Sequence, residues 1–312
     1  MKSPIIPSVN YHLWKPCNMR CKFCFAAFND LSRDELPKGH LPRQRSLEVV
    51  RKLAAFGFQK ITFAGGEPTL CPWLPELIAE AKRAGLTTMI VTNGSRLTDT
   101  FLAKLSPHLD WITLSTDSLD EETNLRSGRA VAGKGQRQVL SEDDYRELAR
   151  QIKGCGIRLK LNTVVHSLNY REDFHQFLEA INPERWKVLQ VLPISGENDA
   201  CFADFSISTA AYNSFLDRHR DVPYMIPEDN NAMSGSYAMV NPAGEFYTNR
   251  RGKYERSLPI LEVGAPAAYQ SMGYSRRKFA ARGGQYQWER RPSPLTLSKL
   301  NVPTPRRFSP SG

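Results

Sequence analysis

Short apolar segments alternate with amphipathic segments through the first 193 residues of the chain. The apolar segments predict β-strands, which we place at residues 9–13, 60–63, 87–92, 111–115, 158–165 and 185–192. Three intervening segments, around Leu47, Leu77 and Tyr145, have apolar residues at helical spacing and end at a glycine. Strands that alternate with helices predict a parallel α/β sheet, either a curved barrel or an open doubly wound sheet.

The pattern changes after Pro193. We expect a helix at residues 209–218, a hairpin with strands at 237–240 and 246–248 around the turn sequence NPAGE, and two short helices. We also expect residues 29–45 to form a surface connection. The chain therefore divides into a core of residues 1–193, an extension of residues 194–290, and a tail of residues 291–312. The tail is rich in Pro, Ser and Arg, so we expect it to be mobile.

Polar residues occupy every second position of several predicted strands, which places them on one face of the sheet. They are Lys60 and Thr62, Thr113 and Ser115, Lys160 and Asn162, and Arg185 and Lys187. Both faces of a parallel sheet are ordinarily apolar, so this face is exceptional, and its excess charge is positive. Buried unpaired cations cost several kcal/mol each, so we expect them to surround an anion such as a polyphosphate.

The polar face could also arise in two ways that need no anion. One side of these strands could face solvent, or the cations could pair with Asp117 and Glu67. The glycine-rich segment SGRAVAGKG adds Arg129 and Lys134 to the possible anion ligands. The chain lacks the phosphate-loop signature G-x4-G-K-[ST], so side chains would hold the phosphates.

Three cysteines, Cys17, Cys21 and Cys24, form a C-x3-C-x2-C pattern on the loop after the first predicted strand. Three thiolates can hold three irons of a 4Fe-4S cluster and leave the fourth iron open to a ligand, whereas electron-carrier clusters use four cysteines. The alternative is a zinc site, but a closed zinc site needs four ligands, and the nearest spare ligand is His12.

The chain has 42 Lys plus Arg against 32 Asp plus Glu among 312 residues, a net charge of +10. This charge fits nucleic acid, an acidic membrane surface or a phosphorylated small molecule, and it also fits a merely solvated surface. An RNA-binding iron–sulfur protein would interleave basic residues with exposed aromatic ones. Here the basic residues lie on predicted buried strands, so we expect no nucleic-acid partner.

The six cysteines do not resemble a disulfide framework, because three of them are clustered. No segment approaches membrane-spanning length, and residues 1–8 contain no signal-peptide core. We therefore expect a cytoplasmic protein without a membrane partner.

The second predicted strand ends in the sequence AGGEP, in which two glycines let backbone groups approach a ligand and Glu67 offers a carboxylate to an ammonium group. The cysteine motif followed by GGEP resembles the radical S-adenosylmethionine enzymes. Within them the chain is most similar to the viperin family, through the segments VNYH, FCF, VTNGS, RWKVLQ, VPYMIPEDNNAM, ILEVG and RGGQYQW in this order. The resemblance implies a partial (β/α)6 TIM-like barrel with a C-terminal extension that closes a nucleotide site.

The resemblance also implies a reaction. S-adenosylmethionine is cleaved reductively to a 5′-deoxyadenosyl radical, which removes the 4′ hydrogen of a ribonucleoside triphosphate. The 3′ hydroxyl then leaves as water, and one electron and one proton give a 3′-deoxy-3′,4′-didehydro nucleotide, a chain terminator in antiviral defence. The substrate would be CTP, UTP or GTP, the electron donor a flavodoxin or ferredoxin, and the protein a monomer.

Site residues follow from the resemblance by position. The 4Fe-4S cluster would be held by Cys17, Cys21 and Cys24, and S-adenosylmethionine by Gly65, Gly66, Glu67, Asn93, Ser115 and Arg185, with Arg185 on its carboxylate. The nucleotide would be bound by Lys60, Thr62, Arg129, Lys160, Asn162, Lys187 and Arg282. Tyr237 would help to quench the product radical. For Tyr237 and Asn162, plain polar packing is the alternative.

The chain departs from the family pattern in four places. Thr62 stands where vertebrate members have an asparagine, which bears on the preferred base, and Ala64 stands where they have a serine. The segment before Cys17 lacks the amphipathic helix of vertebrate members, and the C-terminal end lacks the family's terminal tryptophan. The alternative enzyme class is a peptide-modifying radical enzyme, which commonly carries a further cysteine cluster, and no cysteine follows Cys201.

Overall fold

The computed structural model describes residues 5–133 and 138–289. The predicted mobile tail and Lys134 lie outside these described residues.

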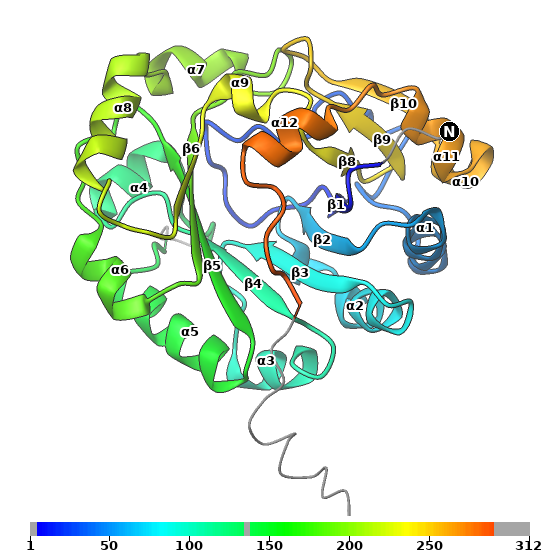
Figure 1. The fold of residues 1–312 in the computed structure, drawn as a ribbon, viewed down its shortest axis with the longest axis horizontal. Coiled ribbons are helices and arrows are strands. Elements are labelled where there is room, and N and C mark those ends of the chain that lie inside the picture. Colours follow the sequence, from blue (N-terminus) through cyan, green and yellow to red (C-terminus); the bar gives the residue numbers. More distant parts are fainter. Residues whose placement is uncertain (1–4, 134–137, 290–312) are drawn as a thin grey trace, which may run out of the picture.

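One ten-stranded sheet organises the molecule, with the strand order β10-β9-β8-β1-β2-β3-β4-β5-β6-β7. Strands β1 to β7 are parallel to one another, β8 pairs with the other side of β1 in parallel, and β9 and β10 add antiparallel pairs. The sheet is curved but not closed (Figure 1). The strands are β1 Ser8–Trp14, β2 Lys60–Gly65, β3 Thr87–Thr92, β4 Trp111–Ser115, β5 Arg158–Val165, β6 Arg185–Gln190, β7 Met225–Glu228, β8 Ala238–Val240, β9 Glu245–Thr248 and β10 Glu255–Pro259.

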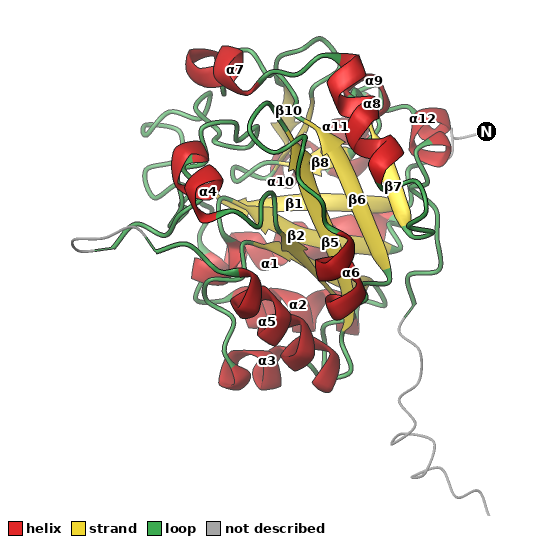
Figure 2. Ribbon diagram, turned by 90° about the vertical axis from the view of Figure 1, so that its left-hand side faces the viewer, coloured by secondary structure: helices red, strands yellow, loops and turns green. Residues whose placement is uncertain are grey.

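The helices of the described residues are α1 Arg43–Phe56, α2 Leu74–Arg83, α3 Asp99–Leu105, α4 Glu121–Ser127, α5 Glu142–Gly154, α6 His175–Ile181, α7 Asp199–Phe205, α8 Thr209–Arg218, α9 Asn230–Met233, α10 Ile260–Val263, α11 Ala265–Gln270 and α12 Arg276–Ala281, with a 3-10 turn η1 Pro68–Leu70. Most of them cover the convex outer face of the sheet, and its concave face lines an inner space (Figures 1 and 2). Met233 of α9 and Phe279 of α12 also line this space, so these two helices border it. Within the described residues, no helix has both the length and the apolar character needed to cross a bilayer.

The predicted α/β architecture is confirmed, and the open curved sheet is the partial barrel that the resemblance implied. The six predicted strands are β1 to β6, and β3, β4 and β5 have the predicted bounds. Strands β7 and β10 were not predicted, and three short helices rather than two follow the hairpin. Strand β7 escapes prediction because it is short and contains Pro227, a residue that an edge strand tolerates.

The outer-facing residues of the strands form the main core together with the helices. Ile61 and Phe63 of β2 are completely buried, as are Ile112 and Leu114 of β4. The same continuous cluster includes residues of the extension such as Phe246, Phe279 and Trp288. The predicted extension therefore shares its core with the barrel.

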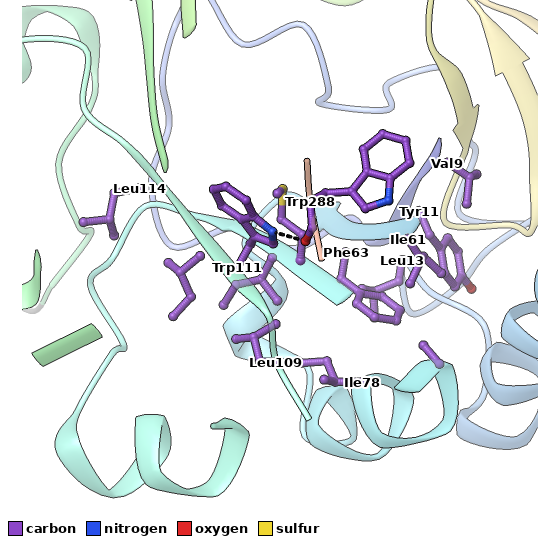
Figure 3. Packing of buried hydrophobic residues seen from close by; sticks show 14 of the residues in the cluster. Val9, Tyr11, Leu13, Ile61, Phe63, Ile78, Leu109, Trp111, Leu114 and Trp288 are labelled. Atoms are coloured by element: carbon purple, nitrogen blue, oxygen red, sulfur yellow. Dashed lines mark hydrogen bonds between the residues drawn. The ribbon is translucent and has the colours of Figure 1, made fainter. Parts of the chain in front are cut away.

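The chain after α12 crosses the concave side of the sheet (Figure 1), and its residues Gly283, Gly284 and Tyr286 line the inner space. The indole nitrogen of Trp111, the first residue of β4, donates a hydrogen bond of 2.6 Å to the carbonyl of Trp288 (Figure 3). The inner space is thus lined by the sheet and closed from one end by the C-terminal part of the described chain.

The expectation that residues 29–45 lie on the surface is partly wrong. Leu31 and Leu36 are buried against Met239 and Tyr247 of the β8–β9 hairpin. This connection therefore packs on the extension, and helix α1 already begins at Arg43.

Candidate active site in the inner cavity

The concave face of the sheet lines a cavity of about 280 Å³. Every residue predicted for the site lines this cavity, with the exception of Arg185. The strand residues predicted for the site therefore lie on one face of the sheet, because residues two apart on neighbouring strands point into the same space.

The cysteine loop forms the end of the cavity at which the strands finish. Cys17, Cys21 and Cys24 are free thiols on the loop that follows β1. Glycine is required where this loop meets the barrel: a Cβ atom on Gly66 would lie 2.3 Å from the carbonyl oxygen of Lys15. The close approach fixes the loop against the end of β2.

The chemistry of the three thiols fits an iron–sulfur cluster. Burial raises the pKa of Cys21 to about 12 and the pKa of Cys24 to about 11, so thiolates need a metal cation beside them. His12, the spare ligand of the zinc alternative, is bonded through Nδ1 to the hydroxyl of Tyr247. Among the described residues, the cavity thus brings together three thiols from one loop, which is the donor set of a cluster with one open iron.

Glu67 organises the cofactor end of the cavity. Its carboxylate accepts hydrogen bonds from the backbone and hydroxyl of Thr69, the hydroxyl of Thr92 and the backbone of Asn93. The Asn93 amide in turn donates to Asn18 of the cysteine loop at 2.9 Å. Glu67 was predicted to receive an ammonium group; most of its hydrogen-bonding capacity instead holds the surrounding loops in place.

Arg129 lies at the same end. Its guanidinium forms an ion pair of 2.7 Å with Asp117 and donates to the carbonyl of Ser115, the last residue of β4. Its charge also offsets part of the rise that burial causes in the pKa of Cys21. Arg129 is therefore placed with the cysteines rather than with the strand lysines with which it was grouped.

Five cations gather at the opposite end, and we call them the cation layer. They are Lys60, Lys160, Arg185, Lys187 and Arg282. Strand register sets Lys160 directly opposite Arg185. Burial and the charges of Arg282 and Arg185 lower the pKa of Lys60 to about 7. Burial and the neighbouring lysines lower the pKa of Lys160 well below its usual value.

Arg185 is the first residue of β6, so it lies at the opposite end of the strands from the cysteine loop. Its guanidinium donates to the carbonyl of Gly283 and stacks on the ring of Tyr286, 4.3 Å from the ring centre. The structure does not bring it together with Glu67, Asn93 and Ser115, the residues with which it was predicted to bind one ligand.

Two residues that contact the cation layer were not predicted from the sequence. Glu228, the last residue of β7, forms ion pairs with Lys187 and Arg282. Tyr286 accepts a hydrogen bond of 3.0 Å from Lys60. Both belong to segments that carry the family resemblance, VPYMIPEDNNAM and RGGQYQW, and the only signal for Glu228 was an acidic residue at the end of a short apolar stretch.

Tyr237 contacts the cation layer, and Asn162 follows Lys160 by two residues on β5, nearer the middle of the cavity. The Tyr237 hydroxyl donates to Glu228 and accepts from Lys187, and the Arg282 guanidinium lies 3.6 Å from the centre of its ring. The side-chain oxygen of Asn162 is buried without a hydrogen-bond partner, although Asn162 lines the cavity. An unpartnered buried oxygen in a cavity is a natural contact for a ligand donor.

Asp173, His175 and His219 form a second group of potential metal ligands, outside the cavity. Both ring nitrogens of His219 are already engaged, Nε2 with the backbone N–H of Phe174 at 3.0 Å and Nδ1 with the carbonyl of Phe215 at 2.9 Å. This group stabilises the start of α6 and the end of α8, and these contacts account for it without a metal.

The sequence profile of the Radical SAM superfamily matches residues 13–181, which is more than half of the chain. The chain therefore belongs to the radical S-adenosylmethionine enzymes, whose cofactors are a 4Fe-4S cluster and S-adenosylmethionine. Cys17, Cys21 and Cys24 are the residues that would hold the cluster.

Curated relatives narrow this class. The chain is 55% identical over 283 residues to the S-adenosylmethionine-dependent nucleotide dehydratase of Lacinutrix mariniflava. The matched region is 91% of this chain and 59% of the relative. It is 50% identical to the protein of the same name from Flammeovirga pacifica (91% and 97% covered) and 33% identical to RSAD2 of Danio rerio (91% and 78% covered). The chain belongs to the family of S-adenosylmethionine-dependent nucleotide dehydratases, the viperin family, although it spans less than two thirds of the Lacinutrix relative.

Solved structures agree on the fold. Native anSMEcpe with bound AdoMet superposes with a TM-score of 0.63 at 16% identity, covering 85% of this chain and 81% of that one. Streptococcus suis SuiB gives a TM-score of 0.58 at 15% identity, covering 90% of this chain and 68% of that one. At these identities the likeness shows the fold alone.

Proposed function

We propose that this protein dehydrates a ribonucleoside triphosphate by radical chemistry, giving the 3′-deoxy-3′,4′-didehydro nucleotide. The single observation that carries the proposal is the pairing of two unlike ends in one cavity: three cysteine thiols at one end and the cation layer at the other. A nucleotide with its phosphates in the cation layer would direct its ribose toward the cysteine end.

A cluster held by Cys17, Cys21 and Cys24 would supply the electron for reductive cleavage of S-adenosylmethionine, the source of the radical that would take the 4′ hydrogen of the ribose. This chain's residues do the positioning. Gly65, Gly66 and Asn93 offer polar backbone and amide groups at the end of the strands beside the cysteine loop. Active sites of barrels form at this end of the strands, because loops from several strands converge there.

We propose that Arg129 and Arg185 have the opposite ligands to those that the sequence suggested. Arg129, which lies beside Ser115 and Cys21, would bind the carboxylate of S-adenosylmethionine, because an Arg–carboxylate pair is strong and directional. Arg185 would bind a phosphate with Lys60, Lys160, Lys187 and Arg282. Its position in the cation layer and its backbone contact with Gly283 support this assignment.

The middle of the cavity would hold the ribose and base. Asn162, with its unpartnered oxygen, and Thr62 of β2 line this part and would contact the nucleoside. Tyr237 is our candidate for the proton donor when the product radical takes up one electron and one proton, because its hydroxyl faces the cavity within a hydrogen-bond network.

The closure of the cavity by the C-terminal segment supports radical chemistry. Tyr286 lines the cavity and contacts the rings of both Trp111 and Trp288, and the Trp111 indole holds the Trp288 carbonyl by a hydrogen bond. A reactive radical attacks most nearby C–H bonds, so the protein must exclude water and hold the correct hydrogen in reach. A cavity closed in this way suits that task.

Anaerobic turnover tests the proposal. Reconstituted protein would be incubated with dithionite, S-adenosylmethionine and each of the four ribonucleoside triphosphates in separate tubes, followed by mass spectrometry. We expect one triphosphate to stimulate 5′-deoxyadenosine formation and to lose one water, and we expect Cys21→Ala to abolish both. The proposal is wrong if 5′-deoxyadenosine forms equally slowly in every tube and no nucleotide changes mass.

A further inference from the structure

Glu228 lies against the cation layer and contacts two of its members. It is the last residue of β7 and is completely buried. Its carboxylate pairs with Lys187 of β6 and, at 3.1 Å, with Arg282 at the end of α12. It also accepts the hydrogen bond from the Tyr237 hydroxyl. One carboxylate therefore connects three residues from separate elements.

The charges around Glu228 are unbalanced. Within the described chain, Lys60, Lys160 and Arg185 have no carboxylate within ion-pair distance. The two buried carboxylates that line the cavity are engaged elsewhere, Asp117 with Arg129 and Glu67 with four hydrogen-bond donors. Five buried cations thus share a single anion.

Glu228 has two opposite effects in such a site. Buried cations without an anion are costly, so its charge stabilises the protein while the phosphate position is empty. The same charge repels an incoming polyphosphate and competes with it for Lys187 and Arg282. A residue that served only to bind phosphate would carry no negative charge here.

We propose that Glu228 is the internal counter-ion of the phosphate site: it neutralises Lys187 and Arg282 in the free protein and yields them to the bound polyphosphate. Glu228 is then a positioning residue, which holds Lys187, Arg282 and Tyr237 in place until the substrate arrives. This inference rests on the proposed function, because it concerns the cations that we assign to the triphosphate.

Glu228→Gln tests the inference, because it removes the charge and keeps an oxygen that can accept from Tyr237. Inorganic tripolyphosphate is the probe, since it carries neither base nor ribose. Reconstituted protein would be studied anaerobically by calorimetric titration and by thermal unfolding. We expect Glu228→Gln to unfold at a lower temperature without ligand, yet to bind tripolyphosphate about threefold to tenfold more tightly than the wild type.

Glu262→Gln is the matched control, because it removes one negative charge from an exposed position on α10. It should bind tripolyphosphate as the wild type does. If Glu228→Gln does not fold, the comparison moves to Lys187→Met, in which adding Glu228→Gln should again tighten binding.

The outcomes separate this inference from the proposed function. A Glu228→Gln protein that binds tripolyphosphate equally or more weakly than the wild type overturns the inference and leaves the dehydratase assignment intact. A wild-type protein that binds neither tripolyphosphate nor any ribonucleoside triphosphate overturns the proposed function itself, and the inference with it.

Discussion

The two ends of the cavity differ in how the protein balances its own polar groups. At the cysteine end, Arg129 has Asp117 as a partner at 2.7 Å, and the carboxylate of Glu67 receives four hydrogen bonds. At the other end, the five cations of the cation layer share Glu228. At the first end the charged groups are already paired in the free protein, and Arg129 keeps one unpartnered nitrogen, Nε, for a ligand. At the second end most of the positive charge is balanced only when an anion enters.

This difference indicates how the ends divide the work. Groups that already satisfy one another lose little freedom when a ligand binds, so the cysteine end suits positioning of the reacting atoms. An unbalanced layer instead supplies affinity and selects for negative charge, because every ligand charge relieves repulsion among the cations. The cavity therefore combines one end that fixes geometry with another that captures substrate.

The largest effects should come from substituting Arg185 and Arg129, which lie at opposite ends of the cavity. Arg185→Met removes one cation from the layer, so we expect the apparent KM for the nucleotide to rise about 10- to 100-fold while the KM for S-adenosylmethionine stays unchanged. Arg129→Lys keeps a charge beside Asp117 but loses the planar guanidinium, so the KM for S-adenosylmethionine should rise instead. Steady-state kinetics with each substrate varied in turn measures both values.

The comparison fails if these effects are reversed. A rise in the KM for S-adenosylmethionine in Arg185→Met would restore the role that the sequence alone suggested for Arg185. It would also mean that the two ligands extend farther along the strands than the positions of the arginines indicate.

The next effect concerns stability. Lys160 is buried, and burial together with Lys187 and Lys60 lowers its pKa well below the usual value. Lys160→Met removes this unfavourable charge and keeps a similar shape, so the nucleotide-free protein should unfold a few degrees higher, as expected for about 1 kcal/mol or more. The KM for the nucleotide should rise about tenfold, because a charge-assisted contact is lost.

Lys52→Met on the exposed surface of α1 is the matched control, since it removes a charge that no ligand is expected to meet. Differential scanning calorimetry on both variants measures the unfolding temperature, and kinetics with the nucleotide varied measures its KM. A Lys160→Met protein that is less stable than the wild type would show that this lysine contributes to the fold and not only to the substrate.

The sequence predicts the chemical character of each end of the cavity better than it predicts which residues form that end. Alternation along the strands found Lys60, Lys160 and Lys187, because side-chain direction depends only on local backbone geometry. The alternation could not assign Arg129 and Arg185 to different ends of the cavity, because both are basic. Only the folded sheet shows that they lie at opposite ends of the strands. Glu228 was missed because its short strand pairs at the sheet edge and carries Pro227.

The smallest effect should be a pH dependence confined to the cation layer. Burial, with Arg282 and Arg185, lowers the pKa of Lys60 to about 7, below that of an unfolded lysine. Above pH 7 the free folded protein therefore binds fewer protons than the unfolded chain, so its stability rises with pH between about 7 and 10.4. Nucleotide binding has the opposite sign, because a bound polyphosphate favours the protonated lysine and binding takes up a proton.

We therefore expect the KM for the nucleotide to rise by up to about tenfold per pH unit above pH 7 for each proton taken up. Lys60→Arg should flatten this dependence, because arginine stays charged throughout the range. The remaining slope would come from Lys187, whose pKa burial also lowers to about 7, and from Lys160, which shares the same surroundings. Kinetics between about pH 6.5 and 8.5 at fixed ionic strength measures the slope. A KM that is constant or falls with pH would mean that the lysines of the layer are already charged in the free protein, and the contrast between the two ends would lose its electrostatic basis.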